Sequence, residues 1–184
     1  MNRKKILKLL AGLTIVLSSS TIINLKGVLV MADDTHSENV DWKFNNSDDG
    51  WKYGGEYDYT GSKEVSYDKL TNALELNLDY RNNALSSWSE FKISKALDSP
   101  IKFDGYNILT YDFIYNPQNM TTGSFKSKLF INGAADSYSD INLENSEDAG
   151  NGLKKAKVTI KFDSKSVNID SIIISIIGNN TDYN

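Results

Sequence analysis

The segment Trp88-Ser89-Glu90-Phe91-Lys92-Ile93 places an aromatic ring and charged groups where they could act together. In a β-strand, successive side chains point to opposite faces of the sheet. If Phe91 and Ile93 face the core, then Trp88, Glu90 and Lys92 face the other way. An exposed ring beside carboxylate groups suits a sugar, because the ring covers the apolar C–H face of a pyranose and the polar groups contact its hydroxyls.

A second segment, Tyr138-Ser139-Asp140-Ile141-Asn142-Leu143, has the same parity. Burial of Ile141 and Leu143 would leave Tyr138, Asp140 and Asn142 on the outer face. A single outward ring is commonly a side chain partly buried at a sandwich edge, and that alternative stays open for each ring. Two such strands in one chain favour a binding face, with Glu90, Asp140 and Asn142 as hydroxyl contacts.

Further aromatic residues follow a turn at Asp49-Gly50, and their direction cannot be fixed from the pattern. They are Trp51, Tyr53, Tyr57 and Tyr59. We treat Trp51 and Tyr57 as ligand-binding candidates. Trp42, beside Phe44 on an expected opening strand, is interpreted as structural.

The sequence gives little support to catalysis or to a zinc or EF-hand site. The chain has no cysteine and one histidine, His36, so thiol chemistry, imidazole zinc sites and Ser/His/Asp triads are poorly supported. Hydrolysis of a polysaccharide needs two placed carboxylates, and the acidic residues on the expected strands alternate toward a solvated face. The loop from Asn45 to Glu56 imitates the spacing of an EF-hand, but Gly54-Gly55 would break the helix that should follow, so we interpret it as a hairpin loop.

Charge is distributed unevenly along the 184 residues. The formal net charge is −4, but residues 1–32 hold five of the 20 basic residues and no acid, which leaves 15 basic against 24 acidic residues, or −9, in the remainder. A surface this negative repels phosphate backbones and anionic lipids. We therefore expect neither nucleic acid nor a membrane surface as partner, and a neutral partner fits better.

Residues 1–32 are typical of an export signal. A basic start is followed by an apolar run from Ile6 to Leu17, and Val30 and Ala32 stand three and one places before an expected cut. A membrane anchor is the alternative, but polar residues interrupt the apolar run before the roughly 20 residues that a spanning helix needs. We expect a secreted bacterial protein that begins near Asp33.

The mature chain, residues 33–184, shows apolar residues with a period of two, separated by clusters of Asn, Asp, Gly and Ser. The alternating sets are Leu74, Leu76, Leu78 and Tyr80; Leu109, Tyr111, Phe113 and Tyr115; Phe125, Ser127, Leu129 and Ile131; and Ala156, Val158, Ile160 and Phe162. The last segment, Val167 to Gly178, is apolar in both directions, which predicts a central strand or one with a bulge. These features predict one all-β domain, an antiparallel β-sandwich of jelly-roll type.

The order of several motifs resembles that of family 27 carbohydrate-binding modules, the mannan-binding β-sandwiches of secreted bacterial endo-β-1,4-mannanases. The resemblance covers about Val40 to Asn184, and the ordered series carries it rather than any single motif. The segments are Asp49-Gly50-Trp51, Asn72 to Leu78, Ser87 to Ile93, Leu109 to Pro117 and Val158 to Asp163.

The resemblance implies non-catalytic binding of β-1,4-mannan or manno-oligosaccharides by three stacked aromatic rings, with no cofactor required, by a monomer that targets an attached mannanase to its substrate. Trp88 matches one ring, Tyr138 stands where Trp is expected, and the third falls within Trp51 to Tyr57. It also implies one more strand beyond Asn184. A structural calcium ion is expected in modules of this kind, with Asp41, Asn45 and Asn46 among its ligands. Without the last strand, the chain to Asn184 would bind calcium weakly or not at all. A small secreted glycan-active hydrolase and a structural or adhesive β-sandwich are the alternatives.

Overall fold

A computed structural model describes residues 27–31, 40–42, 44, 46–69, 71–80, 88–102, 106–163 and 168–183. The strands are β1 (Gly27–Met31), β2 (Val40–Trp42), β3 (Lys52–Tyr57), β4 (Val65–Asp68), β5 (Ala73–Leu76), β6 (Ser89–Lys102), β7 (Tyr106–Tyr115), β8 (Met120–Ile131), β9 (Ala134–Asp140), β10 (Glu147–Gly150), β11 (Leu153–Asp163) and β12 (Asn168–Tyr183). A short 3-10 helix, η2 (Pro117–Asn119), joins β7 to β8. No helix among these residues is long and apolar enough to cross a bilayer.

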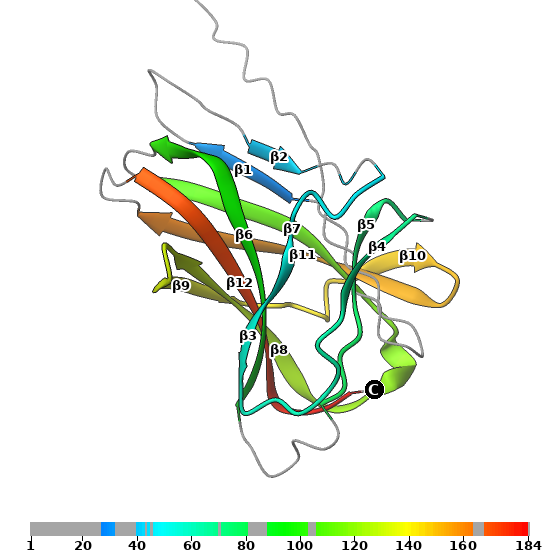
Figure 1. The fold of residues 1–184 in the computed structure, drawn as a ribbon. Coiled ribbons are helices and arrows are strands. Elements are labelled where there is room, and N and C mark those ends of the chain that lie inside the picture. Colours follow the sequence, from blue (N-terminus) through cyan, green and yellow to red (C-terminus); the bar gives the residue numbers. More distant parts are fainter. Residues whose placement is uncertain are drawn as a thin grey trace, which may run out of the picture.

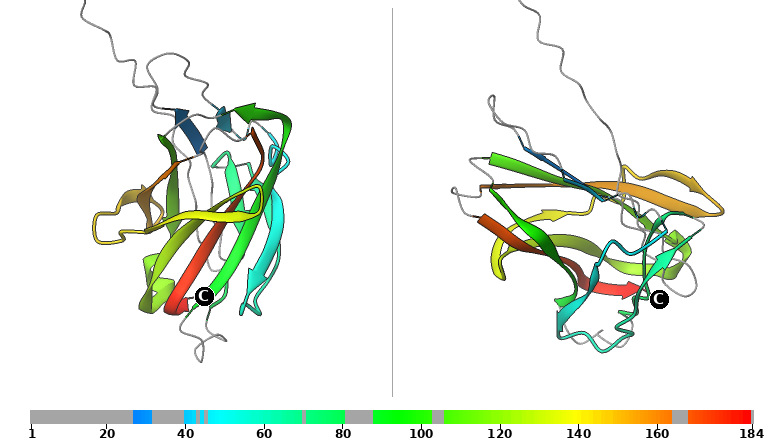
Figure 2. Two further views of the ribbon diagram at one scale, coloured as in Figure 1. Left: turned by 90° about the vertical axis from the view of Figure 1, so that its left-hand side faces the viewer. Right: turned by 45° about the horizontal axis from the view of Figure 1, so that its top comes forward.

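The strands form two five-stranded sheets that pack face to face (Figures 1 and 2). One sheet has the order β10-β11-β7-β1-β2 and the other β3-β6-β12-β8-β9, while β4 and β5 make a separate hairpin. Every pairing is antiparallel, and the chain alternates between sheets from β6 to β7 to β8. The predicted all-β sandwich is confirmed.

Alternation along the strands builds the core between the two sheets. All but one of the side chains predicted to face inward are apolar, and each member of the four alternating sets is at most 7% exposed. The exception is Ser127, whose buried hydroxyl lies near that of Tyr111, and burial raises the pKa of the Tyr111 phenol far above its usual range. The period-two pattern therefore gives each sheet one apolar face, and burial of these two faces against each other stabilises the sandwich.

β12 lies at the centre of its sheet, between β6 and β8, as the apolar run predicts. Ile172, Ile174 and Ile176 are buried on the core side, and Ile177, which faces outward opposite Glu90 and Lys126, is also fully buried. Register shifts at both ends show that the strand is bulged as well as central.

Only one part of the predicted export signal lies among the described residues. Gly27–Met31 forms β1, which pairs antiparallel with β7 from Gly27 opposite Tyr111 to Met31 opposite Asn107, and also pairs with β2. Residues 1–26, Ala32 and His36 lie outside the described residues. Cleavage after Ala32 stays a prediction, and in a chain cut there β7 would lose this neighbour.

Close packing at Gly178 of β12 generates a test of the core. A Cβ atom on this residue would lie 2.6 Å from Cδ1 of Tyr80, whose ring is 1% exposed and whose hydroxyl donates to the carbonyl of Ile176 at 2.9 Å. We expect Gly178→Ala to lower the free energy of unfolding by about 1–3 kcal/mol through overpacking. Urea unfolding measures this, and in a Tyr80→Leu background the same substitution should cost much less. Equal costs in the two backgrounds would show that the Tyr80 ring is not what the methyl group meets.

Candidate functional site

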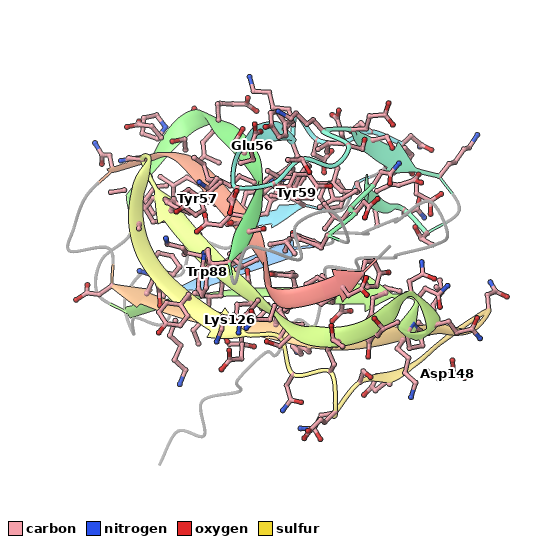
Figure 3. The ribbon with its side chains drawn as sticks, turned by 90° about the horizontal axis from the view of Figure 1, so that it is seen from below. Glu56, Tyr57, Tyr59, Trp88, Lys126 and Asp148 are labelled. Carbon is pink, nitrogen blue, oxygen red and sulfur yellow. The ribbon has the colours of Figure 1, made fainter. Side chains whose placement is uncertain are left out.

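A groove lies on the outer face of the β3-β6-β12-β8-β9 sheet, on the side away from the core. It has a volume of about 460 Å³. Figure 3 labels Tyr57, Trp88 and Lys126 near one another over this sheet, whereas Asp148 lies away from them on β10. The lining side chains are Tyr57, Trp88, Glu90, Lys92, Lys128 and Phe130.

Strand register brings these side chains together from three strands. Tyr57 of β3 stands opposite Glu90 of β6. Lys92 of β6 stands opposite Ser175 of β12, which stands opposite Lys128 of β8. Directly opposed residues in antiparallel strands point to the same face. The groove therefore consists of rows of side chains that run across the strands.

Aromatic rings form the walls of the groove. Tyr57 is 60% exposed at the end of the edge strand β3. Trp88 immediately precedes β6 and is half-buried, and its Nε1 donates to Oε1 of Glu90 at 2.8 Å. This hydrogen bond fixes the direction of the indole, so the ring is held in place before any ligand arrives.

Glu90 forms the floor of the groove and is only 5% exposed. Its Oε2 accepts a hydrogen bond from the Ser175 hydroxyl at 3.2 Å and lies 3.2 Å from Nζ of Lys92, while Oε1 lies 3.7 Å from Nζ of Lys128. Burial alone would raise the pKa of this carboxyl, but the hydrogen bonds from Trp88 and Lys92 and the charges of both lysines outweigh burial and lower it. Glu90 is therefore ionised and already partnered, so it positions its neighbours rather than offering a free acceptor.

Three groove residues are not among the ligand-binding candidates from the sequence: Lys128, Phe130, and Lys92, which the sequence predicts only to face outward. Phe130 lies between the inward-facing Leu129 and Ile131 of β8, so it faces outward like Lys126 and Lys128. Both groove lysines lie beside its ring, with Nζ of Lys92 at 5.3 Å and Nζ of Lys128 at 4.9 Å from the ring centroid. Parity could have found Phe130, but only the register between β6 and β8 shows that the two lysines meet.

The second predicted segment lies on the same sheet but outside the groove. Tyr138 is 64% exposed on the edge strand β9, and Lys126 lies beside its ring with Nζ 6.0 Å from the centroid. Asp140 is exposed and pairs with Lys126. Asn142 follows β9, and its Oδ1 accepts hydrogen bonds from the backbone N–H groups of Glu144 and Asn145, so it caps a turn.

The structure corrects the expectation for Trp51. Its ring is 2% exposed and packs edge-on against Trp42, with ring centroids 5.2 Å apart. The turn at Asp48 to Trp51, closed by a hydrogen bond from Trp51 N to Asp48 O, directs this ring into the core. Trp51 thus cannot stack on a ligand, whereas Tyr57, the other candidate after that turn, faces the groove.

The predicted calcium ligands are only partly among the described residues, because the side chains of Asp41 and Asn45 lie outside them. The nearby Asp49 carboxylate is used within its own loop, where it accepts from the backbone N–H of Phe44 and the hydroxyl of Ser47. In the part of the chain that the structure describes, no three His, Cys, Asp or Glu side chains gather as a metal site. The strand β3 begins at Lys52, so most of the second half of the segment from Asn45 to Glu56 is a strand rather than part of an EF-hand loop. Calcium binding stays a prediction.

Solved structures that share this fold include two carbohydrate-binding modules. TmCBM27, a carbohydrate-binding module studied for its specific recognition of mannan, superimposes with a TM-score of 0.52 and 17% identity over 73% of this chain and 81% of its own. CBM28, a carbohydrate-binding module specific for non-crystalline cellulose, gives a TM-score of 0.52 and 17% identity over 76% of this chain and 84% of its own. No family model and no curated protein matches the sequence. The chain therefore shares the β-sandwich fold of these two modules.

The environment of Glu90 predicts a pH effect on stability. A carboxyl whose pKa is lower in the folded state stabilises the fold above its unfolded pKa of about 4.3, and this contribution is lost as the pH falls through the folded value. We expect Glu90→Gln to lower the free energy of unfolding at pH 7 by about 1–3 kcal/mol, since it removes a buried charge that two lysines face.

Urea unfolding from pH 7 to pH 3 checks this expectation, and the difference between Glu90→Gln and wild type should shrink toward the acid end. Asp140→Asn is the matched control, because Asp140 is exposed and faces one lysine. It should change stability by less than about 1 kcal/mol. A difference for Glu90→Gln that stays constant with pH would contradict the assignment of an ionised, partnered carboxylate.

Proposed function

We propose that this protein binds β-1,4-mannan or manno-oligosaccharides along the outer face of the β3-β6-β12-β8-β9 sheet. The observation that carries the proposal is the groove in which the exposed Tyr57 ring and the fixed Trp88 indole stand over a polar floor. The likeness to TmCBM27 and the motif order of the sequence support mannan as the glycan. CBM28 makes cellulose the first competitor to test.

The geometry suits a chain of sugars rather than a single one. Tyr57 and Tyr138 lie on the two edge strands of the sheet, β3 and β9, with three strands between them. At about 4.8 Å between neighbouring strands, the backbones of β3 and β9 are about 19 Å apart. A glycan lying across the strands would meet Tyr57 and Trp88 in the groove and reach Tyr138 beyond it. The two lysines would donate hydrogen bonds to its hydroxyl oxygens.

The protein would act by binding alone. Among the described residues, Glu90 is the one carboxylate that lines the groove. It is held by two lysines, an indole and a hydroxyl, which leaves it poorly placed to attack or protonate a glycosidic bond. We propose that a secreted form works as a monomer and holds an attached mannanase near its substrate. Tethering raises the local concentration of the enzyme without chemistry from the module.

Affinity electrophoresis tests the proposal. The protein should be retarded in a gel that contains galactomannan and less so, or not at all, in a gel that contains hydroxyethylcellulose. Migration unchanged by galactomannan would remove mannan as the ligand. An assay for reducing ends in a mixture of the protein and mannan tests the hydrolase alternative, and sugar release would replace the binding function with a catalytic one.

Individual rings should contribute unequally to binding. We expect Trp88→Ala to weaken mannan binding the most and Tyr57→Ala next, each by about 1–3 kcal/mol, since a stacked ring buries area like a large apolar side chain. Tyr138→Ala should cost less, because that ring lies outside the groove. Isothermal titration calorimetry with manno-oligosaccharides measures the losses.

Thr159→Ala, on the exposed outer face of β11 in the other sheet, is the control and should bind like wild type. Tyr57→Ala should also keep the unfolding temperature of wild type, because its ring is 60% exposed. Full mannan binding by both Trp88→Ala and Tyr57→Ala would show that the glycan lies elsewhere.

A further inference from the structure

The described side chains of the groove include more positive than negative charges. Lys92 and Lys128 both face the single carboxylate of Glu90, with N–O separations of 3.2 Å and 3.7 Å. Among the six described side chains that line the groove, these three are the charged ones, so the described lining carries one surplus positive charge. This is the reverse of the chain as a whole, whose formal net charge is −4.

The side chains of both lysines are packed against the sheet rather than extended into solvent. The side chain of Lys92 is 20% exposed and that of Lys128 is 28% exposed, compared with 51% for Lys63 in the segment between β3 and β4. Their ammonium groups lie over the ring of Phe130, which attracts cations through its π-face. Charges that are partly withdrawn from water are screened less, so they act more strongly on a bound group.

Two acidic side chains on the neighbouring strands, Asp140 and Glu56, already have partners of their own. On β9, Asp140 pairs with Lys126, and at the end of β3, Glu56 pairs with Lys63 at 2.6 Å. Each of these pairs is neutral. Neither carboxylate lines the groove, so the surplus charge of Lys92 and Lys128 faces the space that a ligand would fill.

We propose that the groove takes an acidic β-1,4-linked glycan, in which a sugar carboxylate binds between Lys92 and Lys128. The proposal rests on the part of the proposed function that places a β-1,4-linked glycan in this groove, and it specifies the chemical class of the sugar. The aromatic walls would contact the ring faces as they would for mannose, and the carboxylate at C6 would supply the counter-charge that Glu90 does not fully provide. A protein that is acidic overall would thus select acidic sugars by local charge.

The experiment uses three oligosaccharides of equal length in titration calorimetry at pH 7. They are a β-1,4-linked manno-oligosaccharide, the matching β-1,4-linked mannuronate and the methyl ester of that mannuronate. All three share the ring stereochemistry, and only the mannuronate is charged. We expect it to bind about five- to tenfold more tightly than the other two, as two partly exposed ion pairs allow.

Lysine variants locate the effect. Lys128→Gln is chosen over a change at Lys92, because Lys128 lies farther from Glu90 and its removal disturbs that carboxylate less. In this variant the affinity for the mannuronate should fall to nearly that for the manno-oligosaccharide, so their ratio should be close to one. Lys161→Gln, on the exposed face of the other sheet, should leave the ratio as in wild type. If Lys128→Gln weakens all three ligands equally, the lysine serves only to hold Glu90 and the proposal is wrong.

The ligands also separate this proposal from the proposed function. Tight binding of the manno-oligosaccharide with no preference for mannuronate overturns the acidic glycan and leaves mannan binding intact. Binding of mannuronate alone supports the acidic glycan and overturns mannan as the ligand. Binding of none of the three overturns both.

Discussion

The rest of the structure depends on the central strand β12, whose apolar side chains must be buried on both faces of its sheet. β12 is 16 residues long and apolar on both sides, so it must be covered on both faces. The core side is covered by the opposite sheet, whereas on the outer face Ile177 is buried between Glu90 and Lys126 of the neighbouring strands. Charged side chains that lie over this apolar surface pack against it along their stems, and this packing holds them in fixed positions.

The site follows from the cost of burying charge on that face. Glu90 is withdrawn from water above β12, and such a carboxylate requires partners. Ser175, Lys92 and Lys128 supply them, and the remaining donor is the indole of Trp88. One buried acid thus determines the direction of the main aromatic ring and gathers the two lysines, so the charge of the groove and its shape have the same origin.

Alternation within single strands could be predicted from the sequence because it is a local property. The buried faces of β7, β8 and β11 and the outward parity of Trp88 and Tyr138 follow from spacing alone. Trp51 could not be placed, because its direction depends on the turn at Asp48 that precedes β3. The groove itself could not be predicted either, since Lys92 and Lys128 lie 36 positions apart and meet only through their shared register with Ser175.

The three tryptophans of the chain occupy two very different environments. Trp42 and Trp51 are 7% and 2% exposed and face one another in the core, whereas Trp88 is half-buried at the groove. A soluble quencher would reach the indole of Trp88 far more readily than the other two, so quenchable tryptophan emission in the folded protein arises mainly from the binding face. The intrinsic fluorescence of the unlabelled protein therefore separates into a core signal that reports folding and a groove signal that reports occupancy.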